Sequence, residues 1–208
     1  HIASKGKPVI MSTGMQTIST IMNSVEILKK ANIPIALLEC TNLYPSPPEN
    51  VSLQGVLELK KNFSDVEVGF SDHSIGPYMI LSSVALGASI IEKHFTDNRY
   101  RLGPDISASM DPSELKLIID RSKEIWAASI NTKKRSLPEE KVYAFARSSI
   151  VADKSLFAGQ KIKESDIWAR RPGNGEIPGY DYKKVIGKVL KNNLSKNTQI
   201  KWSDLQDA

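Results

Sequence analysis

Two of the three histidines in the chain stand at the ends of successive apolar segments, each with a polar neighbour. In residues 66–70 the apolar side chains alternate, so Ser71 and His73 are expected on the opposite face of a strand. In the next apolar segment Glu92 and His94 share one face by the same alternation. If the two segments are parallel neighbouring strands joined by a helix, these four side chains converge at one end of a sheet.

Two imidazoles and a carboxylate in one place suggest a divalent metal site or a general acid–base site. The alternative is structural, because a histidine at a strand end is often satisfied by a backbone carbonyl and has no catalytic role. Two protein ligands are fewer than a closed zinc site uses. The residues alone therefore predict an open site, completed by water or substrate, or no metal site.

The composition indicates an ordinary soluble protein. Of 208 residues, 40% are hydrophobic and 25% are charged, which fits one or two globular domains. The net charge is +5, but the lysines are scattered, which argues against a nucleic-acid partner and weakly suits a small anionic substrate.

Three further observations bear on where in the cell the protein is found and on whether the chain is part of a longer one. The single Cys40 cannot form an internal disulfide, which favours a reducing compartment. No apolar segment approaches the length of a membrane span, so no membrane association is expected. The chain starts with neither Met nor a signal-peptide pattern, so it reads as the interior of a longer protein.

The first part of the chain repeats a strand and a helix. Apolar segments cover residues 9–11, 33–40, 66–70 and 88–95, and predicted helices follow at 18–28, 51–62, 76–86 and from Asp111. Asp111 can cap the last helix, with Pro112 at its first position and Glu114 closing a capping box. Four β/α units predict a parallel sheet, either half of an eight-unit barrel or a doubly wound sheet.

The second part of the chain has a different pattern, with short predicted strands in place of alternating strands and helices. Residues 131–141 are polar and charged, as in a linker. Short strands are predicted at 148–152, 167–169, 185–189 and 198–201, with turns at 158–160 and 195–197. An exposed loop at 170–175 carries two arginines. The predicted domains are residues 1–130 and 147–208, joined by a linker at 131–146.

Six motifs together resemble the N-acetylneuraminate (sialic acid) synthase family, in its order and spacing over essentially the whole chain. They are KPVIMSTGM at 7–15, ECTNLYP at 39–45, GFSDH at 69–73, EKHFT at 92–96, GPD at 103–105 and RPGNG at 171–175. The resemblance implies a (β/α)₈ TIM barrel, of which this chain supplies strands five to eight. It also implies a small, mainly β SAF (antifreeze-like, β-clip) domain that covers the partner's active site in a homodimer.

The resemblance also implies the reaction and the cofactor. The family condenses phosphoenolpyruvate with N-acetylmannosamine and water to give N-acetylneuraminate and phosphate, in the cytoplasm, where phosphoenolpyruvate is found. His73 and His94 correspond to the two protein ligands of Mn²⁺ or Mg²⁺, and imidazole favours Mn²⁺. The first half of the barrel would supply further phosphate-binding residues and a glutamate near the sugar.

The remaining site residues also follow from the resemblance. Ser12, Asn42, Tyr44 and Ser71 match positions that contact phosphoenolpyruvate. Glu92 matches a carboxylate beside the metal, which orients the enol or transfers a proton. The acceptor sugar is expected to contact Asp105, and Arg171 from the partner's small domain is expected to reach the N-acetyl group.

Three alternatives stay open. A related synthase could use the diacetamido sugar that leads to legionaminic acid; residues 106–112 resemble the sialic and legionaminic branch more than the pseudaminic one. The chain could instead be a non-catalytic remnant that binds a saccharide or a partner chain. A generic metal-dependent barrel aldolase or isomerase is the third, but only Glu92 adds a carboxylate to the face of the two histidines.

Overall fold

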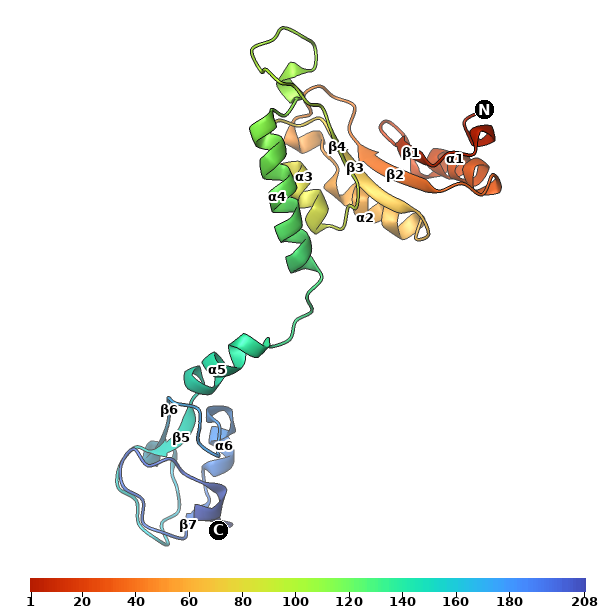
Figure 1. The fold of residues 1–208 in the computed structure, drawn as a ribbon. Helices are drawn as coiled ribbons and strands as arrows, with labels where there is room; N and C mark the ends of the chain where they lie inside the picture. Colours follow the sequence, from red (N-terminus) through yellow and green to blue (C-terminus); the bar gives the residue numbers. More distant parts are fainter. The chain divides into compact units, whose positions relative to one another are not determined.

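The computed structural model describes all 208 residues, which form two compact units, residues 1–131 and 132–208. Figure 1 shows the order of their elements. The first unit is a parallel sheet with helices, and the second consists of short strands with two helices. The unit boundary lies at the start of the segment predicted as a linker, and that segment itself contains a helix, α5 (Leu137–Ala146).

The first unit contains four parallel strands in the order β1-β2-β3-β4. Each strand is followed by a helix, so the four predicted β/α units are present. The elements are β1 (Val9–Ser12), α1 (Ile18–Lys30), β2 (Ile35–Cys40), α2 (Leu53–Asn62), β3 (Glu67–Asp72), α3 (Tyr78–Ala85), β4 (Ile91–Lys93) and α4 (Pro112–Ser129).

Strand β4 is shorter than the apolar segment that predicted it. Its ladder with β3 ends at Lys93, and beyond it only an isolated parallel bridge joins Phe95 to Met110. The sheet therefore has four strands, half the number of a complete (β/α)₈ barrel.

The core of this unit lies between the sheet and its helices. Leu37, Val68 and Phe70 point from β2 and β3 to the helical face and are at most 3% exposed. Ile21 and Val25 of α1, Val56 and Leu59 of α2, and Phe63 complete this cluster. Because side chains alternate along a strand, the residues between them point to the opposite face, where the candidate site lies.

Helix α4 begins as the sequence predicts, but its capping box is only half formed. The Asp111 carboxylate accepts a 2.9 Å hydrogen bond from the backbone N–H of Glu114, and Pro112 stands at the first position. The Glu114 carboxylate does not return to Asp111; it pairs with the guanidinium of Arg99. A cation within reach outcompetes the backbone N–H, since ion-pair hydrogen bonds are the stronger ones.

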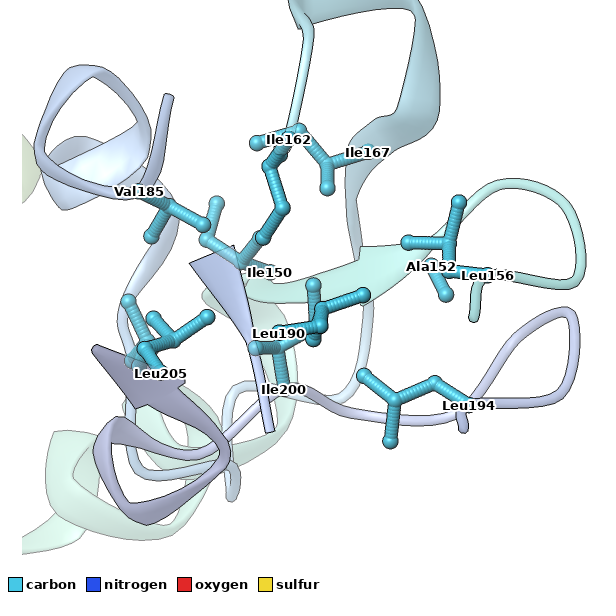
Figure 2. Packing of buried hydrophobic residues seen from close by; sticks show 11 residues of the cluster. Ile150, Ala152, Leu156, Ile162, Ile167, Val185, Leu190, Leu194, Ile200 and Leu205 are labelled. Carbon is cyan, nitrogen blue, oxygen red and sulfur yellow. The ribbon is translucent and has the colours of Figure 1, made fainter. Parts of the chain in front are cut away.

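The second unit is built from two antiparallel strand pairs. Its remaining elements are β5 (Ser149–Ala152), β6 (Ile167–Arg170), α6 (Tyr182–Val185), β7 (Val189–Leu190) and β8 (Leu205–Gln206). Figure 2 shows side chains from all of these short pieces meeting in one apolar cluster, in which Ile150, Ile177 and Ile200 are fully buried. This cluster gives the small unit a core of its own.

Two of the four strands predicted here are wrong. Residues 185–189 are not a strand, because Val185 ends the helix α6 and only Val189 pairs with β8. Gly187, at φ +86°, turns the chain between them. Residues 198–201 form no ladder, although Gln199 makes an isolated bridge to Val151. The two predicted turns are present, with Gly159 and Asn197 at positive φ.

None of the helices in the structure combines the length and the apolar character needed to cross a membrane.

Candidate active site

The pairing of β3 with β4 places four polar residues in two rows. Ser71 lies opposite Glu92, and Asp72 lies opposite Lys93. The first pair points away from the helices, and the Ser71 hydroxyl donates a 2.7 Å hydrogen bond to Glu92 Oε1. The second pair is an ion pair on the helical face. The strand ends are thus joined by side chains on both faces.

The two histidines follow these rows on the same face as Ser71 and Glu92. Their ring centroids are 5.4 Å apart, with the ring planes at 65°. The structure therefore brings Ser71, His73, Glu92 and His94 to one edge of the sheet, as the alternation predicts. This is the carboxyl end of parallel strands, where such folds place their ligands.

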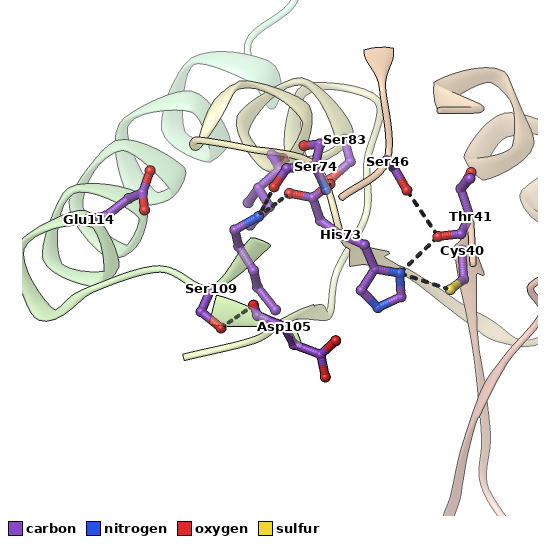
Figure 3. Close-up of polar contacts among 12 residues, drawn as sticks. Cys40, Thr41, Ser46, His73, Ser74, Ser83, Asp105, Ser109 and Glu114 are labelled. Carbon is purple, nitrogen blue, oxygen red and sulfur yellow. Dashed lines mark hydrogen bonds and ion pairs between the residues drawn. The ribbon is translucent and has the colours of Figure 1, made fainter. Parts of the chain in front are cut away.

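His73 is buried and its orientation is fixed by the backbone. It is 6% exposed, and its Nδ1 lies 2.8 Å from the carbonyl oxygen of Thr41. Because a carbonyl only accepts, Nδ1 carries a proton, and in the neutral ring Nε2 is then the nitrogen with the free lone pair. Figure 3 shows the ring with Nδ1 toward Thr41 and Cys40 and its other nitrogen directed away from them.

The group beside the Nδ1 of His94 is a carboxylate, that of Asp105, rather than a backbone carbonyl. The His94 Nδ1 is 3.8 Å from Asp105 Oδ2, and both side chains are partly exposed. The backbone of Asp105 is held in turn, because its carbonyl accepts a 2.8 Å hydrogen bond from the Ser109 hydroxyl. Asp105, predicted as a sugar contact, therefore lies beside His94, at a distance too long for a hydrogen bond to its Nδ1.

Tyr44 packs against both imidazoles. Its ring centroid is 4.1 Å from that of His73 and 5.5 Å from that of His94. Partial desolvation of the phenol, together with the neighbouring Cys40, Asp105 and Glu92, raises the pKa of Tyr44, although the residue is 46% exposed. The phenol therefore stays protonated at neutral pH and can donate a hydrogen bond to an anion.

The other two predicted phosphoenolpyruvate contacts lie farther along the sheet edge. The side-chain Oδ1 of Asn42 accepts a 3.0 Å hydrogen bond from the Cys40 thiol. Asn42 also packs on Gly14, where an added Cβ would lie 2.2 Å from Oδ1. Ser12 is the exposed last residue of β1, separated from β3 by β2.

Two residues at the site were missed by the sequence analysis. The Thr41 carbonyl that holds His73 is a backbone group, which no residue pattern reveals. The Cys40 sulfur lies 3.9 Å from His73 Nδ1, although sequence suggested only a buried position for it. Burial raises the pKa of the Cys40 thiol, so it remains neutral and is a poor nucleophile.

The donor set suits a divalent cation with an open coordination sphere. No group of three or more His, Cys, Asp or Glu side chains is arranged to hold a metal ion. The two imidazole planes lie at 65° to each other, however; the Nδ1 of His73 is 2.8 Å from the Thr41 carbonyl oxygen, and the Asp105 carboxylate lies 3.8 Å from the Nδ1 of His94, beyond hydrogen-bond distance. Metal-binding histidines commonly have such partners, because these leave Nε2 free as the ligand.

Arg171, the remaining predicted residue, belongs to the second unit. It is exposed and lines a pocket of about 520 Å³ together with Tyr143, Arg147 and Tyr180. The loop that carries it is held by Ser149, whose hydroxyl donates to Pro172 O at 3.1 Å and accepts from the Gly175 N–H at 2.8 Å.

Two family models match the chain. The NeuB family matches residues 1–134, and the SAF domain matches residues 147–206. The two matches fall on the two compact units.

Several similar proteins are sugar acid synthases. N,N'-diacetyllegionaminic acid synthase of Campylobacter jejuni is 37% identical over 96% of this chain and 60% of its own length. Human N-acetylneuraminate-9-phosphate synthase is 34% identical over 90% of this chain and 53% of its own length. This chain thus spans less than two thirds of these curated relatives.

A solved structure agrees with them. The N-acetylneuraminic acid (sialic acid) synthetase of Leptospira borgpetersenii, in complex with citrate, matches with a TM-score of 0.64 and 33% identity, over 68% of this chain and 50% of that one. Together, the match to residues 1–134, the SAF match to residues 147–206 and these relatives show that this chain belongs to the NeuB family of sugar acid synthases.

Proposed function

We propose that the protein to which this chain belongs condenses phosphoenolpyruvate with N-acetylmannosamine and water, giving N-acetylneuraminate and phosphate. One observation carries the proposal. Two neighbouring imidazoles, a carboxylate and hydroxyl groups meet at the carboxyl edge of a parallel sheet, in a chain of this family. Such an edge can hold an anionic enol ester beside a polarised carbonyl group.

His73 and His94 are the proposed ligands of a divalent cation, Mn²⁺ in preference to Mg²⁺, because imidazole suits Mn²⁺ better. When bound, the cation supplies Lewis-acid polarisation of the sugar aldehyde. The protein's own part is to hold the His73 ring with Nε2 free, through the Thr41 carbonyl. The Asp105 carboxylate, 3.8 Å from the Nδ1 of His94, is the proposed partner of the second ring.

Phosphoenolpyruvate is proposed to contact Ser12, Asn42, Tyr44 and Ser71. Hydroxyl and amide groups position the oxygens of an anion without adding charge, and the protonated Tyr44 phenol serves the same purpose. Glu92 is assigned to orienting the enol and to accepting a proton from the water that attacks C2. Its hydrogen bond from Ser71 keeps Oε1 in place for both roles.

The acceptor sugar is proposed to contact Asp105 and Arg171. In this proposal Arg171 is contributed by the SAF domain of a second subunit in a homodimer. The pocket around Arg171 supports it, since Tyr143 and Tyr180 add ring faces and hydroxyls beside the two guanidiniums of Arg147 and Arg171. Aromatic and arginine side chains of this kind suit an acetamido sugar. A cytoplasmic location is proposed with it, because phosphoenolpyruvate is found there.

A second acceptor is favoured by one comparison. The Campylobacter relative, at 37% identity, is a diacetyllegionaminic acid synthase, so the diacetamido sugar is the alternative substrate. Phosphate release by the full-length protein, measured with phosphoenolpyruvate, Mn²⁺ and each acceptor in turn, separates the two. Release with N-acetylmannosamine supports the first proposal, and release only with the diacetamido sugar supports the second. Release with neither would support a non-catalytic binding protein.

A further inference from the structure

The ion pair between Asp72 and Lys93 is the most deeply buried charge pair in the structure. The exposed fractions of the two side chains are 1% for Lys93 and 0% for Asp72, and the Nζ–Oδ2 distance is 2.7 Å. Every other ion pair has at least one partner with a side chain more than 25% exposed. This pair lies on the helical face, away from the substrates of the proposed reaction.

Each member of the pair is the chain neighbour of a candidate metal ligand. Asp72 precedes His73, and Lys93 precedes His94. The two residues are also register partners across β3 and β4. A bond between their side chains therefore fixes how far the two strand ends can slide or separate, and the histidines are the next residues on both strands.

Further hydrogen bonds of Lys93 and Asp72 hold the backbone next to His73. Lys93 Nζ donates a second hydrogen bond, of 2.6 Å, to the carbonyl of Ser74. Asp72 Oδ1 accepts one of 3.0 Å from the Ser74 N–H. The carbonyl of His73 itself accepts a 2.9 Å bond from the Ser46 N–H. The backbone of residues 72–74, which carries the imidazole, is thus held by hydrogen bonds on both sides of His73.

Stability alone gives no reason for charges at this position. Removing two charges from water is costly, and an apolar pair of similar volume commonly stabilises a buried site as well or better. Directional bonds, by contrast, fix geometry that apolar contacts leave loose.

We propose that Asp72 and Lys93 are positioning residues, which set the spacing and orientation of His73 and His94 for a divalent cation. The inference rests on the proposed metal site and adds the pair that holds it. Neither residue touches the substrates; they act through the two strand ends. Loss of the pair should therefore weaken metal binding even where the fold is kept.

The test makes two measurements on the native protein and on each variant. Mn²⁺ affinity is measured from the electron paramagnetic resonance signal of free Mn²⁺, and stability is measured as the thermal unfolding midpoint in EDTA. The variant is Asp72→Leu/Lys93→Met in the full-length protein, which replaces the ion pair by an apolar pair. The matched control is Asp65→Leu/Lys29→Met, because Lys29 and Asp65 also pair at 2.7 Å but are 42% and 67% exposed.

We expect the double variant to keep its unfolding midpoint and to bind Mn²⁺ about 10–100-fold more weakly, as is usual when the groups that orient metal ligands are lost. The control should bind with native affinity. Native Mn²⁺ affinity in the folded double variant would overturn the positioning role. Absence of Mn²⁺ binding by the native protein would instead overturn the metal site itself, so the two failures are distinct.

A second variant covers the case in which the first does not fold. Asp72→Asn/Lys93→Met keeps an acceptor for the Ser74 N–H but removes the bond between the strands. Mn²⁺ binding should again be about tenfold weaker or worse. In the metal-free protein, the Nδ1–H proton of His73 should also exchange faster with water by nuclear magnetic resonance, because its bond to Thr41 is no longer held in place. Unchanged affinity and exchange would contradict the proposal.

Discussion

Ser71 and Glu92 are register partners on β3 and β4, and the Ser71 hydroxyl donates a 2.7 Å hydrogen bond to Glu92 Oε1. The bond occupies one lone pair of Oε1, and by holding the carboxylate plane it also fixes the direction in which Oε2 points. Glu92 lies on the face of His73 and His94, so its free oxygen is available to a substrate. This relationship supports the proposal that Glu92 transfers a proton at this site.

Glu92→Gln tests that role. Gln keeps a carbonyl oxygen that can accept from Ser71 but cannot take up a proton at neutral pH. We expect phosphate release to fall by about 10²–10⁴-fold, the usual contribution of a general base, with the KM for phosphoenolpyruvate nearly unchanged. Steady-state kinetics of the full-length protein measure both values. Turnover close to that of the native protein would remove Glu92 from proton transfer.

Tyr44 can be tested separately for its hydroxyl and its ring. Tyr44→Phe keeps the ring against His73, at a centroid distance of 4.1 Å in the native structure, and removes the phenol. Loss of a hydrogen bond to a charged ligand should raise the KM for phosphoenolpyruvate about 10–100-fold, while Mn²⁺ affinity stays native. Tyr44→Ala, which also removes the packing on His73, should weaken Mn²⁺ binding as well. An unchanged KM in the Phe variant would contradict the assignment of Tyr44 to phosphoenolpyruvate.

Glu39 predicts a pH dependence of stability. Burial, and then repulsion by Glu58, raises the pKa of Glu39 from 4.5 to about 7. Between these values the folded protein keeps a proton that the unfolded chain has released. The free energy of unfolding should therefore fall as pH rises from 4.5 to about 7 and change no further above it through this group.

Glu39→Gln should remove this slope. At pH 8 the variant should be more stable than the native protein by an amount on the order of 1 kcal/mol, a value reduced for the partial solvent exposure of Glu39. Chemical denaturation of both proteins from pH 5 to pH 8 measures the difference. Parallel curves across this range would show that Glu39 does not hold its proton in the folded state.

Gly69 tests how closely the strands approach at the site. On β3, a Cβ added to Gly69 would lie 2.3 Å from the Ile90 carbonyl oxygen and 2.5 Å from Leu38 Cδ2. The backbone must move to admit it, so Gly69→Ala should destabilise the protein by about 1–3 kcal/mol. Gly103→Ala is the control, because its nearest contact is the flexible Ile106 side chain at 3.1 Å. Equal unfolding midpoints for the two variants would contradict this reading of the packing.

The sequence was sufficient for the four β/α units and for the face on which the histidines lie. Alternation along a strand depends only on neighbouring residues, which is why Ser71 and His73 could be placed together. The Thr41 carbonyl and the ring of Tyr44 reach His73 from the loop that follows the neighbouring strand β2. These contacts depend on the path of a loop in space, which residue types do not encode.

The small domain shows the same limit for secondary structure. β-Branched residues at 185–189 favoured a strand, but Val185 reaches the apolar core from a helical turn instead. Tertiary packing overrides local preference where an element is only a few residues long. The turns at Gly159 and Asn197 were predictable because few residues adopt positive φ without strain.

Phosphate release with and without His73 tests the central claim most directly. The full-length protein and its His73→Ala variant would be assayed with phosphoenolpyruvate, N-acetylmannosamine or the diacetamido sugar, and Mn²⁺. We expect the native protein to release phosphate only when both substrates and Mn²⁺ are present. The variant should lose that release while its unfolding midpoint stays close to native. Release that is unaffected by the substitution would contradict the role of His73 and the site built around it.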